Sequence, residues 1–171
     1  QQLSELSVDA WQHYTQRLDP VPLAWLKTAK SKLTKTSVID SDGAVLSHGK
    51  LLAATMAFAK RISLCTKNAE LVQENVGVLL PSSSAAIIAN MALMLKGKTA
   101  VNLNYTASPQ AFQASLARAG IVNVVSSKRF LAKLKQRGIL LEPLLKNVNV
   151  ILMEDLKASI SPLTWVSNLA C

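Results

Sequence analysis

The sequence predicts an α/β fold in which a parallel sheet has helices on both faces and an antiparallel hairpin lies near the start. From residue 75 onward, short apolar segments alternate with helical segments, which is typical of buried parallel strands joined by crossover helices. The chain has 171 residues, of which 50% are hydrophobic, so it is long and apolar enough to enclose a core. Only 5% of the residues are aromatic, and the core is therefore expected to be aliphatic.

The first part of the chain is predicted to be a helical lead-in or linker over residues 1–22, followed by one larger unit over residues 23–171. Apolar residues recur in the lead-in at near-helical spacing until Asp19 and Pro20 interrupt them. Pro22 suits the first turn of a second helix over residues 23–33. The expected packing side of that helix consists of Leu23, Trp25, Leu26 and Leu33.

A hairpin is predicted over residues 37–46, because the segments 37–40 and 44–46 flank a polar turn that contains Gly43. Ser47 follows as the expected N-cap of a helix. The apolar stripe of this helix consists of Leu51, Leu52, Met56, Ala59 and Ile62.

The second half of the chain has the strand and helix alternation on which the fold class rests. Ser108 is the expected N-cap of one helix, with Pro109 at its first position, and Gly120 and Gly138 follow the ends of two helices. The predicted strands are residues 76–80, 100–103, 122–125 and 148–152, and the predicted helices are residues 83–95, 108–118 and 127–137.

One uncharged segment has the length of a membrane span. It comprises the 21 residues between Glu74 and Lys96. Pro81 and the serines 82–84 lie near its centre, so a buried strand, a turn and an apolar helix explain the segment better than a membrane helix does.

The charge balance is basic, with 19 Lys and Arg against 10 Asp and Glu, a formal net charge of +9. The basic residues are spread over stretches such as 27–35 and 128–137 without an arginine-rich run, so nucleic acid is not an expected partner. An anionic membrane surface or an acidic protein remains open. Cys65 and Cys171 do not make a disulfide framework, and residues 1–19 lack the order of a signal peptide, so we expect a cytoplasmic protein, with inner-membrane association only through other parts of a larger protein.

Sequence motifs for catalysis or metal binding are missing. Gly43 and Gly49-Lys50 are spaced one residue too widely for a P-loop, and Leu51 stands where Ser or Thr would hold magnesium. His13 and His48 are far apart and have no acidic or cysteine cluster beside them, so no metal site is predicted. The neighbours Glu154 and Asp155 indicate a helix N-terminal charge pair rather than a catalytic couple, and no catalytic residue is assigned.

One region is placed to contact a ligand. Pro81 and Ser82 to Ser84 follow one predicted strand, where free backbone N–H groups and hydroxyls are expected, and Asn104, Tyr105 and Thr106 follow the next strand. If the two strands are neighbours, both loops lie at one edge of the sheet, where α/β folds usually bind ligands. Ordinary capping and turn formation explain the same residues and are the favoured reading from sequence alone.

The motif order also resembles a known superfamily. The segments NVGVLLPS (75–82), AVNLNYT (100–106) and AGI (119–121), preceded by IDSDGAVLSHGKL (39–51), are similar to the early part of the AMP-binding, adenylate-forming acyl-activating enzymes. The segments NLNYTA (102–107) and VVSSKRF (124–130) look most like the synthetase half of the bacterial bifunctional 2-acylglycerophosphoethanolamine acyltransferase/acyl-acyl carrier protein synthetases. Ser82 and Ser83 depart from the family's usual Asn and small polar residue, and His48 replaces its common Tyr.

The resemblance implies that the chain is the N-terminal fragment of an acyl-activating ligase. The parent would form an acyl-adenylate from ATP and a fatty acid with Mg²⁺, and then pass the acyl group to the thiol of acyl carrier protein or CoA. The fragment stops before the family's phosphate loop, so by itself it is expected to be inactive, to bind neither cofactor and to have the rest of the parent as its partner. The resemblance implies part of the acyl-pocket wall for Pro81, Ser82, Asn104, Tyr105 and Thr106.

Two other classes of protein stay open. The chain could be a self-contained α/β binding or regulatory module that shares the sheet without the chemistry. It could also be an interaction domain whose basic surface meets acidic partners such as acyl carrier protein or anionic lipid.

Overall fold

The computed structural model describes residues 6–8, 11, 14–15, 18–41, 43–65 and 74–159. The elements follow one another along the chain in the order α2 (Val21–Ser31), β1 (Thr36–Ile39), β2 (Val45–Ser47), α3 (His48–Cys65), β3 (Asn75–Val78), α4 (Ser84–Leu95), β4 (Thr99–Asn102), α5 (Pro109–Arg118), β5 (Asn123–Ser126), α6 (Lys128–Gln136), β6 (Asn149–Leu152) and α7 (Met153–Ala158).

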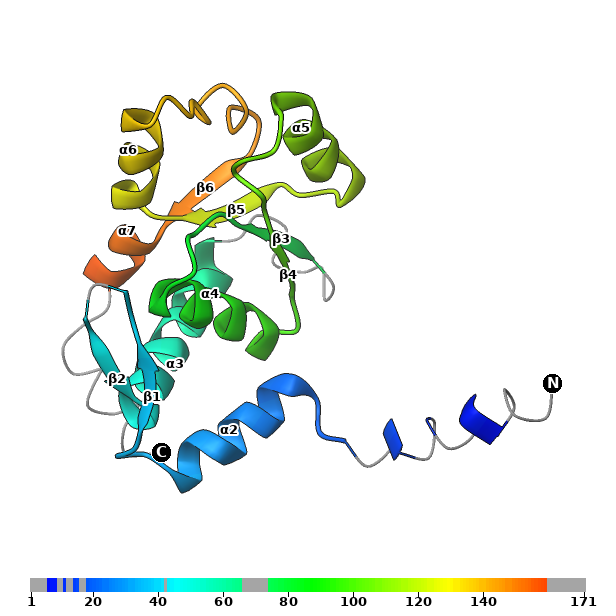
Figure 1. Ribbon diagram of the computed structural model, residues 1–171, viewed down its shortest axis with the longest axis vertical. Coiled ribbons are helices and arrows are strands. Elements are labelled where there is room, and N and C mark those ends of the chain that lie inside the picture. Colours follow the sequence, from blue (N-terminus) through cyan, green and yellow to red (C-terminus); the bar gives the residue numbers. More distant parts are fainter. Residues whose placement is uncertain are drawn as a thin grey trace.

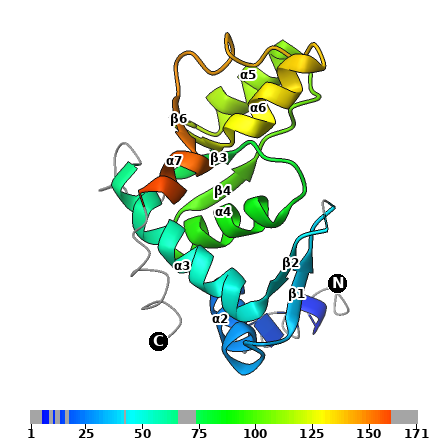
Figure 2. The same cartoon turned by 90° about the vertical axis from the view of Figure 1, so that its left-hand side faces the viewer.

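The centre of the molecule is a parallel four-stranded sheet with the order β4-β3-β5-β6. Both views show α5 and α6 on one face and α3 and α4 on the other (Figures 1 and 2). The hairpin β1-β2 is antiparallel and forms a separate small sheet. The predicted α/β class, the parallel sheet covered on both faces and the early hairpin are confirmed.

The strand residues face two hydrophobic cores alternately. Val76 and Val78 of β3 point to the core formed with α3, α4 and α7, while Leu79, directly after the strand, faces the core formed with α5 and α6. In β5, Val125 belongs to the first core and Val124 to the second. All five of these side chains are buried, which explains why the strands read as continuous apolar segments.

Gly77 of β3 has no side chain, and residues of the second core fill the space beside it. A Cβ atom at this position would lie 2.9 Å from Cδ1 of Leu103, 3.1 Å from Cγ2 of Val124 and 3.3 Å from Cγ2 of Ile121. The space of a side chain is therefore already filled by its neighbours, and a glycine is required by packing rather than by backbone conformation.

The predicted caps are present at the helix ends. The hydroxyl oxygen of Ser47 accepts a hydrogen bond from Lys50 N at 3.3 Å, and that of Ser108 accepts one from Ala111 N at 3.2 Å. Gly120, which follows α5, has a φ of 59°, a left-handed conformation that favours glycine. These local signals explain why the predicted boundaries of the helices and strands differ from the observed ones by only one or two residues.

The segment that imitates a membrane span, residues 75–95, divides into β3, a turn and α4, as predicted. Among the residues that the structure describes, no helix is long and apolar enough to cross a membrane. The near match to a P-loop is the turn of the hairpin, where Gly43 has a φ of 85°, followed by the start of α3.

The predicted packing side of the second helix is confirmed in part. It begins at Val21, with Pro22 in the first turn, and ends at Ser31. Leu23 and Leu33, predicted to face the core, are 43% and 44% exposed. Trp25 packs against the core as predicted and Leu26 is half-buried, while Ala29, which the prediction did not include, is fully buried. Because α2 contacts mainly α3, only a narrow face of the helix reaches the core.

The lead-in is described in part. Residues 6–8, 11 and 14–15 are helical, as predicted, whereas Leu3 and His13 lie outside the described residues. Leu6, Trp11 and Tyr14 are each about two-thirds exposed, at 66%, 67% and 65%. The division of the chain at residues 22 and 23 stays a prediction.

Candidate functional site

The candidate site is the carboxyl rim, which we define as the loops at residues 79–83 and 103–108 that follow β3 and β4. The two strands are parallel neighbours, with Val78 paired to Asn102 at their ends. Both loops therefore leave the sheet at the same edge, as predicted for neighbouring strands. In α/β folds this edge is where ligands usually bind.

The first loop of the carboxyl rim is organised by Ser83. Its hydroxyl donates a hydrogen bond to the carbonyl oxygen of Pro81 at 3.0 Å and accepts one from Ala86 N at 3.4 Å. Ser83 is thus the N-cap of α4. Pro81 is half-buried and Ser82 is exposed, so Ser82 is the residue of this loop that is most open to a bound molecule.

The backbone at the start of α4, predicted to be free, is occupied by Asp40 from the end of β1. Ser84 donates two hydrogen bonds to Oδ2 of Asp40, from its N–H at 2.8 Å and from its hydroxyl at 2.7 Å. These bonds lower the pKa of the Asp40 carboxyl below its ordinary value. The prediction of free donors here is wrong at Ser84, because the hairpin brings a carboxylate to the helix N-terminus.

The second loop of the carboxyl rim is a turn closed by Asn104. Its Oδ1 accepts hydrogen bonds from the N–H of Thr106 at 2.9 Å and from the Thr106 hydroxyl at 2.7 Å. Tyr105 lies half-buried between them, with its ring edge-on to Phe130 and the two ring centroids 5.1 Å apart. Asn104 and Thr106 are exposed, so this loop offers two polar side chains and one aromatic anchor.

A pair of amides that the sequence did not reveal lies beside this loop. Asn90 of α4 and Asn102 of β4 exchange hydrogen bonds of 3.1 and 3.0 Å between their side chains. The two residues are 12 positions apart, and only the return of the chain from α4 into β4 brings them together. The pair ties the helix to the strand directly before the second loop.

The N-terminus of α6 is also filled by a carboxylate of the chain. Oε1 of Glu154 accepts a hydrogen bond from the Ser127 hydroxyl at 2.8 Å, and its Oε2 accepts one from Lys128 N at 3.0 Å. Burial opposes ionisation of Glu154, but these bonds together with one from Arg129 N outweigh it and lower the pKa of Glu154. At α4 and at α6 alike, donors that could bind a phosphate group already bind a carboxylate.

Glu154 and Asp155 lie in the first turn of α7, as the predicted helix charge pair requires. Asp155 also accepts a hydrogen bond from Nζ of Lys128 at 2.5 Å, and this contact raises the pKa of Lys128. Both partners are exposed, so the pair contributes little to stability. Neither carboxylate is arranged as half of a catalytic couple.

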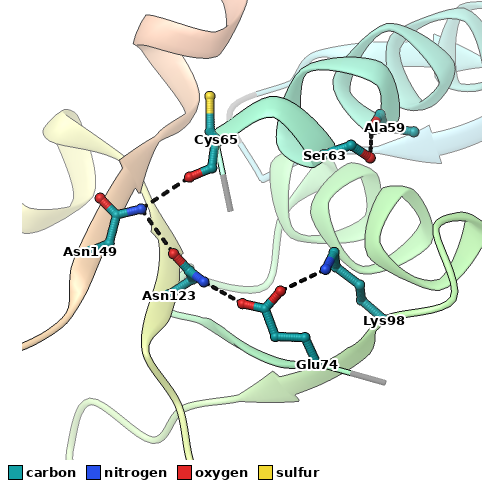
Figure 3. A network of polar contacts seen from close by, with 7 residues as sticks. All are labelled: Ala59, Ser63, Cys65, Glu74, Lys98, Asn123 and Asn149. Atoms are coloured by element: carbon teal, nitrogen blue, oxygen red, sulfur yellow. Dashed lines mark hydrogen bonds and ion pairs between the residues drawn. The ribbon is translucent and has the colours of Figure 1, made fainter. Parts of the chain in front are cut away.

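A buried polar network crosses the opposite, amino edge of the sheet (Figure 3). Nζ of Lys98 lies 2.6 Å from Oε2 of Glu74, and Nδ2 of Asn123 donates to the other carboxylate oxygen. Nδ2 of Asn149 in turn donates to Oδ1 of Asn123 at 2.9 Å and to the carbonyl oxygen of Cys65 at 3.1 Å. These residues stand at the amino ends of all four strands, away from the carboxyl rim, so we assign the network to structure.

Metal-binding side chains are not clustered in the part of the chain that the structure describes. No group of three or more His, Cys, Asp or Glu side chains is placed there to hold an ion. His48 begins α3, and its Nδ1 is buried without a hydrogen-bond partner among the described residues. Cys65 is an exposed free thiol at the end of α3.

Comparison with solved structures identifies the architecture, while no protein-family model matches the sequence. The N-terminal subdomain of NpsA from Klebsiella oxytoca is similar with a TM-score of 0.65 and 16% identity, covering 85% of this chain and 34% of that one. O-succinylbenzoate coenzyme A synthetase (MenE) from Bacillus subtilis is similar with a TM-score of 0.61 and 19% identity, covering 80% and 26%. The nonribosomal peptide synthetase FmoA3 is similar with a TM-score of 0.64 and 15% identity, covering 84% and 15%.

The chain thus spans about a third or less of the length of these proteins. Two of the solved structures show bound nucleotides or analogues: the Bacillus subtilis synthetase is in complex with AMP, and the NpsA subdomain is in complex with 3-hydroxyanthranilyl-AMSN. At these identities the similarity establishes the fold. The chain has a fold found in the N-terminal subdomain of adenylate-forming enzymes.

Proposed function

We propose that this chain is the N-terminal part of an ATP-dependent ligase that activates a fatty carboxylate as its adenylate and passes the acyl group to a thiol. The observation that carries the proposal is that two independent features agree. The order of the segments at residues 39–51, 75–82 and 100–106 resembles the acyl-activating superfamily, and the fold is that of adenylate-forming enzymes.

Within that superfamily, the segments at residues 102–107 and 124–130 support an acyl-acyl carrier protein synthetase of the 2-acylglycerophosphoethanolamine acyltransferase type. On this proposal ATP and Mg²⁺ are used by the parent enzyme, and the acceptor thiol belongs to acyl carrier protein or CoA. The basic net charge of +9 suits an acidic carrier protein or an anionic membrane beside the parent.

The role proposed for this chain in the reaction is to hold one wall of the acyl pocket. Ser82, Asn104 and Thr106 are exposed in the loops of the carboxyl rim, and Pro81 and Tyr105 of the same loops are half-buried. Asn104 fixes the second loop through its bonds to Thr106, and Tyr105 anchors that loop against Phe130. A preformed wall of this kind would orient the acyl chain without taking part in the phosphoryl chemistry.

The phosphoryl chemistry itself would need other residues of the parent. At α4 Asp40 engages the N–H of Ser84, and at α6 Glu154 engages those of Lys128 and Arg129, so these donors are not open to a phosphate group. Stabilising charge on a transferring phosphoryl group requires donors, cations and metal that point at it. We therefore propose that the 171 residues alone do not form an adenylate.

The test uses the full-length protein that contains this chain, with exchange of labelled pyrophosphate into ATP in the presence of fatty acids of different lengths. Pyrophosphate exchange that depends on added fatty acid supports the proposal. If none of the carboxylates tested gives exchange, the proposal is contradicted. Ser82→Phe should lower kcat/KM for long-chain acids by about tenfold through steric exclusion, with less effect on short acids. Lys96→Phe, a similar change in an exposed residue beyond the end of α4, is the control and should leave chain-length preference unchanged.

The isolated chain provides the second arm. Pyrophosphate exchange by the 171 residues alone would overturn the assignment of this chain as a non-catalytic part. If instead the full-length protein shows no exchange but binds acidic proteins or anionic vesicles in a salt-dependent way, the alternative of an interaction module is favoured.

A further inference from the structure

A basic groove lies where the end of α2, the start of β1 and the start of α3 meet. Its volume is about 600 Å³, which is within the size range of small-molecule sites. It lies at the opposite end of β1 from Asp40, the residue through which the hairpin reaches the carboxyl rim. The residues that line it are Lys30, Ser31, Lys32, Leu33, Thr34, Lys35, Thr36 and His48.

The charge of this basic groove is not neutralised by the described part of the chain. Lys30, Lys32 and Lys35 fall within six consecutive residues, and none of them forms an ion pair with a described carboxylate. The nearest acidic residues along the described chain are engaged elsewhere: Asp19 binds Lys27, and Asp40 binds Ser84. Because all three lysines line one groove, their positive charges favour an anion bound there.

The backbone of the basic groove is fixed before any ligand binds. Gly49 N donates to the carbonyl oxygen of Leu33 at 2.8 Å, and His48 N donates to that of Lys35 at 2.9 Å. A Cβ atom at position 49 would lie 3.0 Å from the oxygen of Leu33, so the close approach of α3 to this loop depends on glycine. The loop that carries Lys32 and Lys35 is therefore held against α3, which lowers the entropy cost of binding.

We propose that this basic groove binds a phosphate-bearing anion through Lys30, Lys32 and Lys35. A doubly charged phosphate group neutralises more of the three positive charges than a single carboxylate does, and lysine is a common phosphate ligand because it acts as a compact point charge. The hydroxyls of Thr34 and Thr36 line the same space and can add hydrogen bonds. The inference is independent of the proposed function, since it uses none of the residues of the carboxyl rim.

The soluble arm of the test titrates the full 171-residue chain with inorganic pyrophosphate and follows backbone amide shifts by NMR. The amides of residues 32–36 and 48 should shift, and acetate at matched ionic strength should not reproduce the shifts. The variant K30Q/K32Q/K35Q should bind at least roughly tenfold more weakly, because three ionic contacts are lost. The control K133Q/R137Q/K146Q removes the same charge from exposed residues elsewhere and should bind like the original chain.

A lipid arm distinguishes the source of the phosphate. Vesicles of phosphatidylcholine with and without phosphatidylglycerol are tested by sedimentation with the same variants. Binding to the anionic vesicles alone, lost in K30Q/K32Q/K35Q, assigns the phosphate to a lipid headgroup and supports the proposal. Equally weakened binding in both triple variants would show a diffuse charge effect and overturn the proposal. The proposal is also overturned if the chain binds neither pyrophosphate nor anionic vesicles, or if acetate causes the same amide shifts as pyrophosphate. Thermal unfolding of each variant checks that its fold is intact.

Discussion

The buried pair of Glu74 and Lys98 is the residue-scale feature with the largest expected effect on stability. Both side chains are about 95% buried, and Glu74 also accepts a hydrogen bond from Asn123. Lys98→Met leaves the carboxylate buried without its cation and should lower the free energy of unfolding by about 3–5 kcal/mol. Urea unfolding monitored by circular dichroism measures the change.

A double variant separates the loss of the pair from the penalty of an isolated charge. In E74Q/K98M the glutamine can still accept the bond from Asn123, and no buried charge is left alone. The double variant should therefore be more stable than Lys98→Met by itself. A single Lys98→Met variant as stable as the original chain would show that the pair is open to water.

Gly77 gives a second residue-scale prediction. Gly77→Ala places a methyl group 2.9 Å from Leu103 and should cost about 1–3 kcal/mol through overpacking. Gly120→Ala meets no atom within 4 Å and should cost about 1 kcal/mol, through its φ of 59° alone. Combining each change with Leu103→Val in a double-mutant cycle should show coupling for Gly77→Ala and additive effects for Gly120→Ala. If neither double-mutant cycle shows coupling, the steric explanation for Gly77 is wrong.

At the scale of elements, the carboxylate of Glu154 joins α7 to the N-terminus of α6. Glu154→Gln should lower the free energy of unfolding by about 1–2 kcal/mol at neutral pH, because an amide nitrogen replaces one acceptor oxygen. The pKa of Glu154 is lowered by folding, so its stabilisation is present above its ordinary value of 4.5 and is lost as pH falls through the lowered value.

The difference in stability between the original chain and Glu154→Gln should consequently shrink as unfolding is measured at pH 6, 4 and 3. Asp155→Asn is the matched control, since Asp155 is exposed and its ion pair is with the exposed Lys128. It should change stability little at any of these pH values, because both partners are exposed to solvent. A pH-independent effect of Glu154→Gln would rule out the role of its charge.

Most elements could be predicted because their signals are local. Ser47 and Ser108 cap helices within three residues of themselves, and Gly43 and Gly120 adopt the positive φ that their turns require. The packing side of α2 could be predicted only in part, since Trp25 packs against the core whereas Leu23 is exposed and Ala29 is buried in its place. Which face is buried depends on how α2 lies against α3, a tertiary contact.

Of the candidate site, only the two strands and the loops that follow them could be predicted. The sequence located the two loops, and the pairing of β3 with β4 places them at one edge. It did not reveal that Asp40, 44 residues before Ser84, fills the start of α4, or that Asn90 and Asn102 face each other. These contacts join residues far apart in the chain, and single polar residues in a sequence do not indicate their partners.

At the scale of the whole molecule, the four-stranded sheet couples the two hydrophobic cores. Ile62 of α3 is fully buried in one core, and Leu134 of α6 is 2% exposed in the other. Ile62→Ala and Leu134→Ala should each lower the free energy of unfolding by about 2–5 kcal/mol. Because β3 and β5 contribute to both cores, each change should reduce amide hydrogen-exchange protection in the strands and on both faces. Protection lost on one face only would show that the two layers unfold separately.

The amino-edge network has a consequence for how the strands find their partners. The four strands, NVGV, TAVN, NVVS and NVIL, are short and rich in similar small apolar residues, and apolar packing alone would discriminate weakly between a correct alignment and one slipped by a residue. A slip of β5 against β3 would pull Asn123 away from Glu74 and bury unpaired polar groups. The network therefore specifies the register of the strands, through Lys98, Glu74, Asn123 and Asn149. It destabilises misaligned pairings during folding and stabilises the folded sheet.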